Sequence, residues 1–416
     1  MTTLTRRSAL MAGAALIGGA GLPLGARRAR ALAAPRKLIL VLASGGWDPT
    51  YSLDPKSTGG VVDAPEGTVQ DFSGLRVLTH ESRPSVAAFF AQYAERSAIV
   101  NGIQVRSFVH ADCMKRILTG TASDQNADFG ALAAFESGRE LPVPYLVLGT
   151  SAMSGPLASI TGRAGTTNQL SSLLSPSDAD PFLPPPPLST SDTESAAIGR
   201  YLQAALAREQ ALRGQFGGNA RQLEAFQKSL ERSGLLRRFA AERGGFGARG
   251  YTPDLMVQVD VAVSAIEGDL CQVSMLELPN WDTHQNNAQQ GPMHEALYTG
   301  LLHLAESLEA KALFDRTTVV VLSEMGRTPK LNSALGKDHW PVTSAIIFGA
   351  GVVGGQVIGG TDDSQNALNA NLRNGDVDAT GKQIQTSNLT AGLLKLVGVD
   401  PAPHFPDVEP LDALVS

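Results

Sequence analysis

The sequence predicts an α/β fold in which helices cover both faces of a mostly parallel sheet, with a helical insertion between two parts of that sheet. The first observation is a series of short, continuous apolar runs, which are typical of buried parallel strands. These runs are residues 37–43, 97–100, 144–148, 271–278, 317–323 and 344–349. The second observation is helical periodicity between several of them, clearest at 292–314 and again at 388–397. Strands that alternate with helices favour a sheet covered on both sides.

The first 33 residues have the features of a twin-arginine signal peptide. Arg6 and Arg7 precede an apolar, glycine-rich stretch at 9–24, and Ala-Leu-Ala at 31–33 suits signal peptidase. The apolar stretch is short and broken by glycine and proline, which argues against a membrane helix. We therefore expect the twin-arginine export machinery to deliver a folded protein to the periplasm or beyond, with no stable membrane span after processing.

The rest of the chain divides by composition into three parts. Residues 34–175 and 251–416 carry the apolar runs, so we assign them to the two parts of the α/β core. Residues 176–250 begin with a segment rich in Pro and Ser that includes four prolines at 184–187, and then become charged and helical in pattern. This middle part is predicted to be a linker followed by the helical insertion.

Composition excludes some classes of partner. The chain is 43% hydrophobic and 18% charged, as in an ordinary soluble globule, and its net charge is −6. Because the mature chain has no basic run, nucleic acid is not an expected partner. Cys113 and Cys271 lie far apart, and a free buried thiol is the prediction for Cys271 at the start of an apolar run.

Acidic and histidine residues follow three of the apolar runs and precede a fourth. Because the carboxyl ends of parallel strands meet at one edge of a sheet, we expect the side chains that follow the first three runs to converge. Carboxylates and imidazoles together can bind a divalent cation, whose charge offsets their mutual repulsion. The candidates are Asp48, Asp282, His284, Glu324, Asp338 and His339.

Each candidate also has an alternative, structural interpretation. An Asp after a strand often caps a turn, Glu324 could pair with Arg327, and His339 could be a half-buried histidine. The positions of the three tryptophans favour a site. Trp47, Trp281 and Trp340 all lie directly beside these Asp and His residues, which predicts one walled, partly dry pocket.

Three motifs together resemble a large bacterial family of exported proteins of unknown function. They are Trp-Asp-Thr-His at 281–284, Ser-Glu-Met-Gly-Arg-Thr at 323–328 and Gly-Lys-Asp-His-Trp at 336–340. That family is placed in the alkaline phosphatase and sulfatase-like superfamily. The resemblance covers nearly the whole mature chain and includes Gly-Gly-Trp-Asp at 45–48.

The resemblance implies an alkaline phosphatase-like fold and a centre for hydrolysis of a small anionic phosphate or sulfate ester. The six candidates above would hold a divalent metal ion, whether zinc, calcium, magnesium or manganese. Arg327 would hold the anion, because guanidinium suits tetrahedral oxyanions. Counting back from Leu-Thr-Gly at 118–120, His110 stands where relatives carry a Ser, Thr or Cys nucleophile. The resemblance therefore implies His110, or a water molecule activated by the metal, as nucleophile.

Two alternatives remain open from the sequence. A non-catalytic member of the superfamily could keep the pocket to bind an anionic ligand or partner in the periplasm or at the cell surface. A metal-dependent phosphomutase-like enzyme is the third hypothesis, because fold alone does not determine function.

Overall fold

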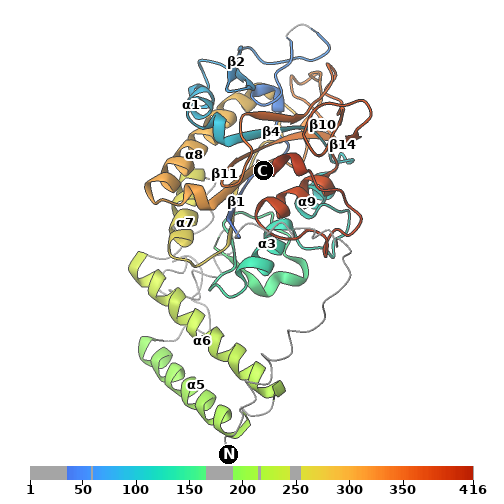
Figure 1. Ribbon diagram of the computed structural model, residues 1–416. Coiled ribbons are helices and arrows are strands. Elements are labelled where there is room, and N and C mark those ends of the chain that lie inside the picture. The colour runs from blue at the N-terminus through green and yellow to red at the C-terminus, as the bar shows by residue number, and fades with distance from the viewer. Residues whose placement is uncertain (1–34, 58–59, 165–190, 214–216, 244–253, 416) are drawn as a thin grey trace, which may run out of the picture. The chain divides into compact units, whose positions relative to one another are not determined.

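The computed structural model describes residues 35–57, 60–164, 191–213, 217–243 and 254–415 (Figure 1). The predicted signal peptide lies outside the described residues, as does the proline-rich part of the predicted linker up to residue 190. Among the described residues, no helix combines the length and the apolar character needed to cross a bilayer.

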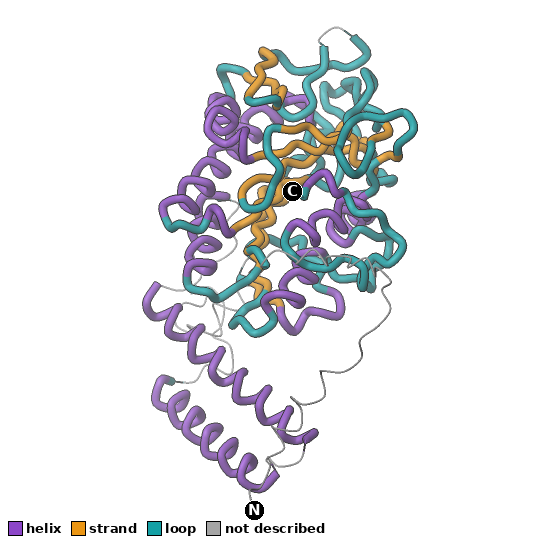
Figure 2. The backbone as a smooth tube through the Cα atoms, in the orientation of Figure 1, coloured by secondary structure: helices purple, strands orange, loops and turns teal. Residues whose placement is uncertain are grey.

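An eight-stranded sheet forms the centre of the fold (Figure 2). Its strands are β1 (Lys37–Ala43), β4 (Ser97–Gln104), β5 (Tyr145–Val147), β6 (Thr161–Arg163), β7 (Val273–Leu278), β8 (Thr317–Leu322), β11 (Val342–Gly349) and β12 (Gln356–Gly359). The order across the sheet is β12-β4-β11-β8-β1-β7-β5-β6. Only β11 runs antiparallel to its neighbours β4 and β8, so the mostly parallel sheet that the sequence predicts is confirmed.

Helices cover both faces of this sheet, as the sequence also predicts. On one face, α1 (Pro84–Tyr93), α7 (Leu255–Glu267) and α8 (Gln290–Ala310) share a core with Ile39 and Val41 of β1. On the other face, α2 (His110–Thr119), α3 (Phe129–Gly138) and α9 (Thr386–Leu396) share a core with Leu38, Leu40 and Leu42. Successive residues of a strand point to opposite faces, so a strand buried on both sides must be apolar throughout.

The helical patterns at 292–314 and 388–397 correspond to α8 and α9. The α8 leucines Leu297, Leu301, Leu304 and Leu308 are all buried, as their spacing predicts. Burying one such side chain contributes roughly 1.5–3 kcal/mol, so this stripe is enough to hold α8 against the sheet. Both cysteines are free and buried, which confirms the prediction for Cys271.

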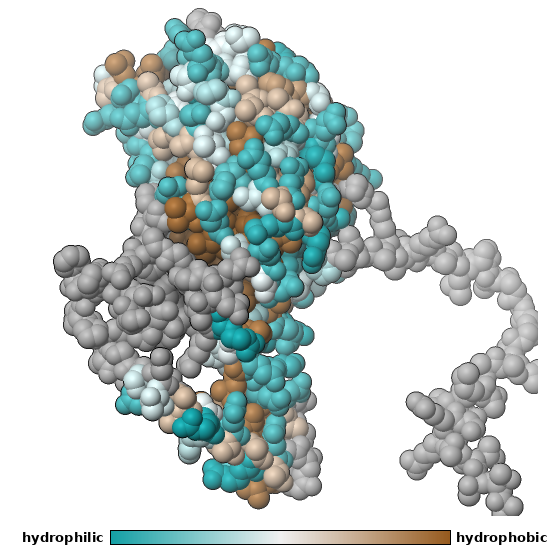
Figure 3. All heavy atoms as spheres, turned by 90° about the vertical axis from the view of Figure 1, so that its left-hand side faces the viewer, coloured by the Kyte–Doolittle hydropathy of each residue, from teal (hydrophilic) through white to brown (hydrophobic). Residues whose placement is uncertain are grey.

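Three two-stranded ribbons accompany the sheet. They are β2 (Thr68–Phe72) with β3 (Leu75–Thr79), β9 (Gly326–Arg327) with β10 (His339–Trp340), and β13 (Asn369–Ala370) with β14 (Lys382–Gln383). The β9–β10 ribbon matters most here, because it sets His339 directly opposite Arg327. On the side shown in Figure 3, hydrophilic residues are interspersed with smaller apolar areas over the described part of the chain.

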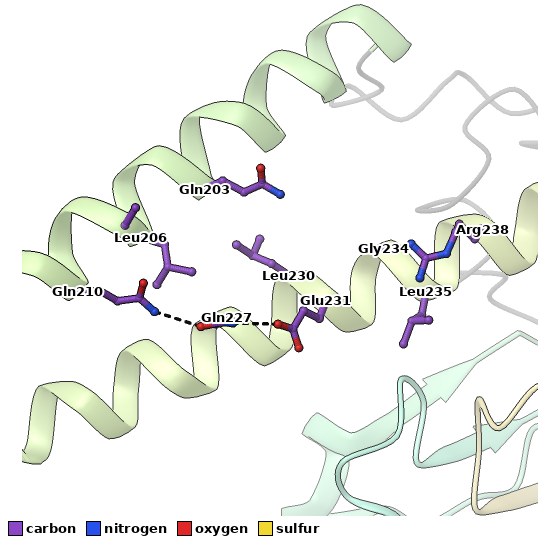
Figure 4. A pocket seen from close by; sticks show the side chains of 10 residues that line it. Gln203, Leu206, Gln210, Gln227, Leu230, Glu231, Gly234, Leu235 and Arg238 are labelled. Carbon is purple, nitrogen blue, oxygen red and sulfur yellow. Dashed lines mark hydrogen bonds between the residues drawn. The ribbon is translucent and has the colours of Figure 1, made fainter. Parts of the chain in front are cut away.

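Two long helices, α5 (Asp192–Arg213) and α6 (Gly217–Arg243), occupy the part of the chain predicted as a helical insertion. Figure 4 shows Leu206 of α5 and Leu230 of α6 pointing toward one another across the space between the helices. Beside them, Gln210 Nε2 donates a hydrogen bond of 3.1 Å to Gln227 Oε1. The sequence prediction of an insertion that interrupts one sheet is consistent with β5 and β6 before these helices and β7 after them.

A buried histidine joins the aromatic part of the core beneath the strand ends. The ring of His294 in α8 stacks at 5.6 Å on Tyr51 and meets Trp281 edge-on at 5.0 Å. Its Nε2 lies 3.2 Å from the carbonyl oxygen of Asp48, which can only accept, so Nε2 carries the proton and Nδ1 can accept from Ser52. Burial lowers the pKa of His294 to about 3, so the ring stays neutral in the folded protein.

We predict that His294 makes the protein acid-sensitive. An unfolded histidine titrates near 6.5, so acid stabilises the unfolded chain below that pH while the folded ring stays neutral. The contribution of His294 to the free energy of unfolding is therefore complete above about pH 6.5 and is lost as the pH falls toward 3. At pH 5 the loss is about 2 kcal/mol. Urea unfolding at pH 7 and pH 5 tests this, with a chelator present so that metal release plays no part. Between the two pH values, the free energy of unfolding should fall less in His294→Phe than in wild type. His80→Phe, at a partly exposed position, is the control, and an equal drop in all three proteins would contradict the prediction.

Candidate metal centre

The candidate site lies where β1, β7 and β8 end, at their carboxyl edge. The loop after β1 passes very close to the loop after β7: a Cβ on Gly45 would lie 2.6 Å from the backbone nitrogen of Asp282. Gly45 also has a φ of +121°, a conformation that side-chain-bearing residues avoid. Glycine at this position therefore lets the two loops meet.

Three imidazoles and one carboxylate converge between these loops. The Nε2 atoms of His284 and His339 are 2.8 Å apart, and Oδ1 of Asp282 lies 3.2 and 3.4 Å from them. His110, the first residue of α2, brings its Nε2 to 3.4 Å from Oδ2 of the same aspartate. Donor atoms of His110, Asp282 and His339 lie within 4.8 Å of one another, close enough to share one metal ion.

The second nitrogen of each ring is already engaged. Nδ1 of His110 lies 2.9 Å from Glu324 Oε1, Nδ1 of His284 lies 2.8 Å from Asp338 Oδ1, and Nδ1 of His339 lies 2.6 Å from the carbonyl oxygen of Phe108. A carbonyl or carboxylate oxygen can only accept, so each Nδ1 carries a proton, and Nε2 is the atom of each ring that is left to bind a cation.

This arrangement fits a cation. Two facing lone pairs 2.8 Å apart repel unless a proton or a metal ion lies between them. Nε2 of His110 is buried without a hydrogen-bond partner, which ordinarily costs free energy. Histidines that bind metals almost always donate their other N–H to a carboxylate or carbonyl, as all three rings do here. The donor set of the four residues therefore suits a divalent metal ion.

The electrostatics keep the carboxylates ionised. Burial acts to raise the pKa of Asp282, but its hydrogen bond and charge interaction with Arg327 outweigh burial and hold that pKa below its usual value. The hydrogen bond from His284 lowers the pKa of Asp338 in the same way. The bond with Glu324 raises the pKa of His110 against desolvation, so Glu324 makes this imidazole more basic.

Arg327, predicted to hold an anion, is instead buried and committed to the protein. Its Nε donates to the carbonyl of Gly46 at 2.7 Å and its Nη1 to the carbonyl of Lys337 at 3.1 Å. Its Nη2 donates to the Gly45 carbonyl and, at 2.7 Å, to Asp282 Oδ1. These contacts make Arg327 a residue that positions Asp282 and the neighbouring loops.

Asp48, predicted as a metal ligand, also has other partners. Its carboxylate is fully buried and accepts hydrogen bonds from Lys337 Nζ at 2.7 Å, Thr50 Oγ1 at 2.7 Å and Asn287 Nδ2 at 2.9 Å. Burial acts to raise the pKa of Asp48, but the Lys337 ammonium and these hydrogen bonds hold it below its usual value. The charge of Asp48 is thus balanced by Lys337, and within the described part of the chain its carboxylate bonds to these residues rather than to the imidazole cluster.

Glu324 and Asp338 contact the cluster through the Nδ1 atoms of His110 and His284, and not through the Nε2 atoms that face one another. Glu324 is buried, accepts from the backbone N–H of Gly45 at 2.8 Å and holds His110. Asp338 holds His284 and also accepts from Asn332 Nδ2 at 3.2 Å. The structure therefore brings six of the eight predicted site residues into one network, with Arg327 at its edge and Asp48 in a separate buried pair.

The tryptophans do not wall a pocket as predicted. Trp47 and Trp281 are fully buried and pack edge-to-face at 6.3 Å beneath the loops. Trp340 is half-buried and donates its indole N–H to the carbonyl of Gln365 at 2.9 Å. Trp47 and Trp281 thus belong to the core that supports the loops, where large aromatic side chains bury much apolar area.

Sequence reasoning missed two contributors. Lys337 lies inside the Gly-Lys-Asp-His-Trp motif at 336–340, so its presence there was a usable signal. Phe108 acts through its backbone carbonyl, which any residue type would supply, so no pattern of side chains could have indicated it.

A family model described as "Protein of unknown function (DUF1501)" matches residues 35–409. The chain belongs to this family. This DUF1501 protein matches no curated protein significantly.

Several solved structures resemble it distantly. The lipoteichoic acid synthase LtaP from Listeria monocytogenes is 9% identical, with 92% of this chain and 76% of that chain covered and a TM-score of 0.40. The PsFucS1 sulfatase from Pseudoalteromonas sp. is 12% identical, with 88% and 68% covered and a TM-score of 0.37. The C-terminal periplasmic domain of EcEptC from Escherichia coli is 10% identical, with 90% and 86% covered and a TM-score of 0.39. Similarity at this level carries no statement about the activity of this chain.

We predict that the Asp48–Lys337 pair supports the fold without binding metal. Lys337→Met leaves a carboxylate buried without a counter-charge, so it should lower the free energy of unfolding by about 3–5 kcal/mol in urea titrations. Asp48→Asn combined with Lys337→Met removes both charges and should recover most of that loss. The double variant should also keep the metal content of wild type. Loss of metal from the double variant would return Asp48 to the ligand set.

Proposed function

We propose that this protein is an exported, metal-dependent hydrolase of small phosphate or sulfate esters. The observation that carries the proposal is the set of three imidazoles whose Nε2 atoms face one another around the carboxylate of Asp282. His110, Asp282, His284 and His339 would be the ligands, while Glu324 and Asp338 would orient two of the rings.

The donor set favours zinc over the harder ions. Calcium and magnesium take mostly oxygen ligands, whereas imidazole suits zinc and its neighbours in the transition series. Three imidazoles and one carboxylate are donors of the kind that zinc takes in proteins, and an ester would add a further ligand to these four. When bound, the ion would act as a Lewis acid on an ester oxygen.

The chain's own residues would hold this centre rigid and open. Arg327 fixes Asp282 from beneath, and Glu324 and Asp338 fix two rings from behind. The Asp282 and His284 side chains both remain 43% exposed, so an ester can approach from solvent. The ester class itself is supported by the motif resemblance at 281–284, 323–328 and 336–340.

Ligation by His110 implies hydrolysis without a covalent enzyme intermediate. His110 stands at the position of the nucleophile in relatives, yet its Nδ1 is tied to Glu324 and its Nε2 is aimed at the cluster. Cys113, one turn along α2, is buried, and burial raises the pKa of its thiol to about 11. A buried, protonated thiol is a poor nucleophile.

The same observation favours a second candidate function. A chain whose nucleophile position serves as a ligand could bind an anionic ester or partner through the centre without turning it over. Metal content and turnover, measured on the same preparation, separate the two functions.

We predict that each ligand histidine is needed for both metal and turnover. Replacing His110, His284 or His339 with Ala removes one coordinating group, so metal content by mass spectrometry should fall well below wild type. Hydrolysis of aryl phosphate or aryl sulfate esters should be lost together with the metal. The melting temperature in metal-replete buffer should also fall, because a ligand that binds only the folded state stabilises it.

His303→Ala is the matched control for these variants. This histidine lies on α8 and bonds Asp260 at 2.7 Å, away from the strand ends. It should keep wild-type metal and turnover. Wild-type metal content in His110→Ala would remove His110 from the ligand set. Bound metal without turnover in the wild-type protein would rule out the hydrolase and support the second candidate, binding of an anionic ester or partner.

We predict that Arg6→Lys with Arg7→Lys keeps the precursor in the cytoplasm, because the export receptor reads the paired guanidinium groups. Fractionation of a tagged variant tests this, with wild type as the control. Normal recovery of the double variant outside the cytoplasm would contradict the twin-arginine assignment.

A further inference from the structure

The helical hairpin of α5 and α6 uses one side of α5 to pair its two helices. Gln203, Leu206 and Gln210 lie on the side of α5 that is turned toward α6 (Figure 4). Leu206 is buried in this contact, and Gln210 donates its hydrogen bond to Gln227 of α6. This pairing therefore accounts for one apolar side of α5.

A second apolar side of α5 is exposed. Ile198 is 48% exposed, Tyr201 67% and Leu212 61%. Ile198, Ala205 and Leu212 follow one another at intervals of seven residues, and a heptad falls only about 20° short of two full turns of an α-helix. The three therefore lie in one line along α5, with Tyr201 beside it, three residues after Ile198. We name these four residues the α5 stripe.

The α5 stripe is distinct from the side that meets α6. Leu206 follows Ala205 by one residue, and successive residues of an α-helix are about 100° apart, so the two sides are about a quarter turn from each other. Pairing of α5 with α6 needs only one apolar side, so the stripe is available to a further helix. Single exposed apolar residues need no explanation, but a line of them at heptad spacing is the pattern of a helix–helix contact.

We propose that the α5 stripe binds the α5 stripe of a second copy of this chain, with the two helices antiparallel and Ala205 at the twofold axis. This inference is independent of the metal centre. A twofold interface must be self-complementary, because the same surface supplies both halves. Ile198 and Leu212 lie at equal distances on either side of Ala205, so antiparallel pairing places Ile198 of each copy opposite Leu212 of the other. The small side chain of Ala205 lets the helices approach closely at the axis.

The charged residues beside the stripe also suit this pairing. Arg208 follows Tyr201 by one heptad and so lies on the same side of the stripe. Antiparallel pairing about Ala205 brings Arg208 of one copy close to Tyr201 of the other, and a guanidinium group near a tyrosine ring is a favourable contact. On the other side of the stripe, Glu209 pairs with Arg213 of its own helix at 3.3 Å, which offsets its charge.

The hairpin is large enough for a stable dimer. Because the stripe is a quarter turn from the α6 contact, two hairpins paired this way stack face to face as a four-helix bundle. The 22 residues of α5 span roughly 33 Å, and two helices side by side are roughly 20 Å wide. The resulting face of roughly 660 Å², before the relief of the side chains is counted, is close to the roughly 800 Å² that each partner buries in a standard interface.

A membrane surface fits the stripe less well. A helix that lies in a membrane interface has a polar face rich in Lys and Arg. The helix α5 instead carries three acidic and three basic residues. Mixed charges beside an apolar seam are typical of helices that pair with other helices.

Disulfide trapping in the full-length protein tests the position of the twofold axis. Ala205→Cys should form an intermolecular disulfide under mild oxidation, because two cysteines can bridge when their Cα atoms lie within roughly 7 Å. Both native cysteines are buried, so they do not compete. Ala207→Cys is the matched control, because Ala207 is exposed on the groove side of α5 and should give little cross-linking.

Charge substitutions test the antiparallel register. Ile198→Lys with Leu212→Lys sets like charges against one another across the interface, so sedimentation should show association weakened about 100-fold or more. Ile198→Lys with Leu212→Glu brings opposite charges together in an antiparallel dimer only, and should recover most of the association. Val377→Ser removes an exposed apolar side chain outside the hairpin and should leave association unchanged.

Each other outcome overturns the proposal or its geometry. A wild-type protein that stays monomeric at high concentration, with no cross-link in Ala205→Cys, would overturn the dimer. Equal cross-linking of Ala207→Cys would mean random collision rather than a fixed axis. Equal loss of association in both charge variants would overturn the antiparallel register. A monomeric wild type that binds phosphatidylglycerol vesicles, with loss of binding in Ile198→Glu, would assign the stripe to a membrane instead.

Discussion

The buried guanidinium of Arg327 is the contact on which the rest of the centre depends. It joins the Gly45–Gly46 turn after β1, the carboxylate of Asp282 after β7 and the backbone of Lys337 ahead of β10. Loops at the ends of parallel strands have few backbone partners of their own, so they need such a cross-link to hold a fixed geometry. Arginine suits the task because its planar fork offers several donors in fixed directions.

A second buried cation supports the first. The backbone carbonyl of Lys337 accepts a hydrogen bond from Arg327, and the ammonium group of Lys337 pairs with Asp48. Both charged groups of this pair are fully buried. Such a pair contributes little net stability compared with apolar residues, yet breaking it is costly. Together Arg327 and Lys337 hold the three loops in one arrangement. The imidazoles are positioned by these fixed loops.

The fold was predictable because its signals are local. An apolar run at 37–43 and a leucine stripe at 297–308 state directly which residues face a core, and β1 and α8 formed where expected. The convergence of the loops that carry Asp282, His284 and Glu324 was also predictable, since these loops follow parallel strands that end at one edge of the sheet. The roles within the site were not predictable, because they depend on which atom of each side chain is already bonded. By residue type, Asp48 looks like a metal ligand and Arg327 like an anion receptor. In the structure Asp48 is paired with Lys337 and Arg327 is paired with Asp282.

The donors of the centre are scattered along the chain, at 110, at 282 and 284, and at 339. Nearly the whole polypeptide must be synthesised and folded before the set of four exists. Metal loading at the proposed centre would therefore be a late event that reports completed folding. If the protein is exported already folded, as we propose, the ions that compete for the centre would be those of the compartment in which it folds, not those of the compartment in which it works.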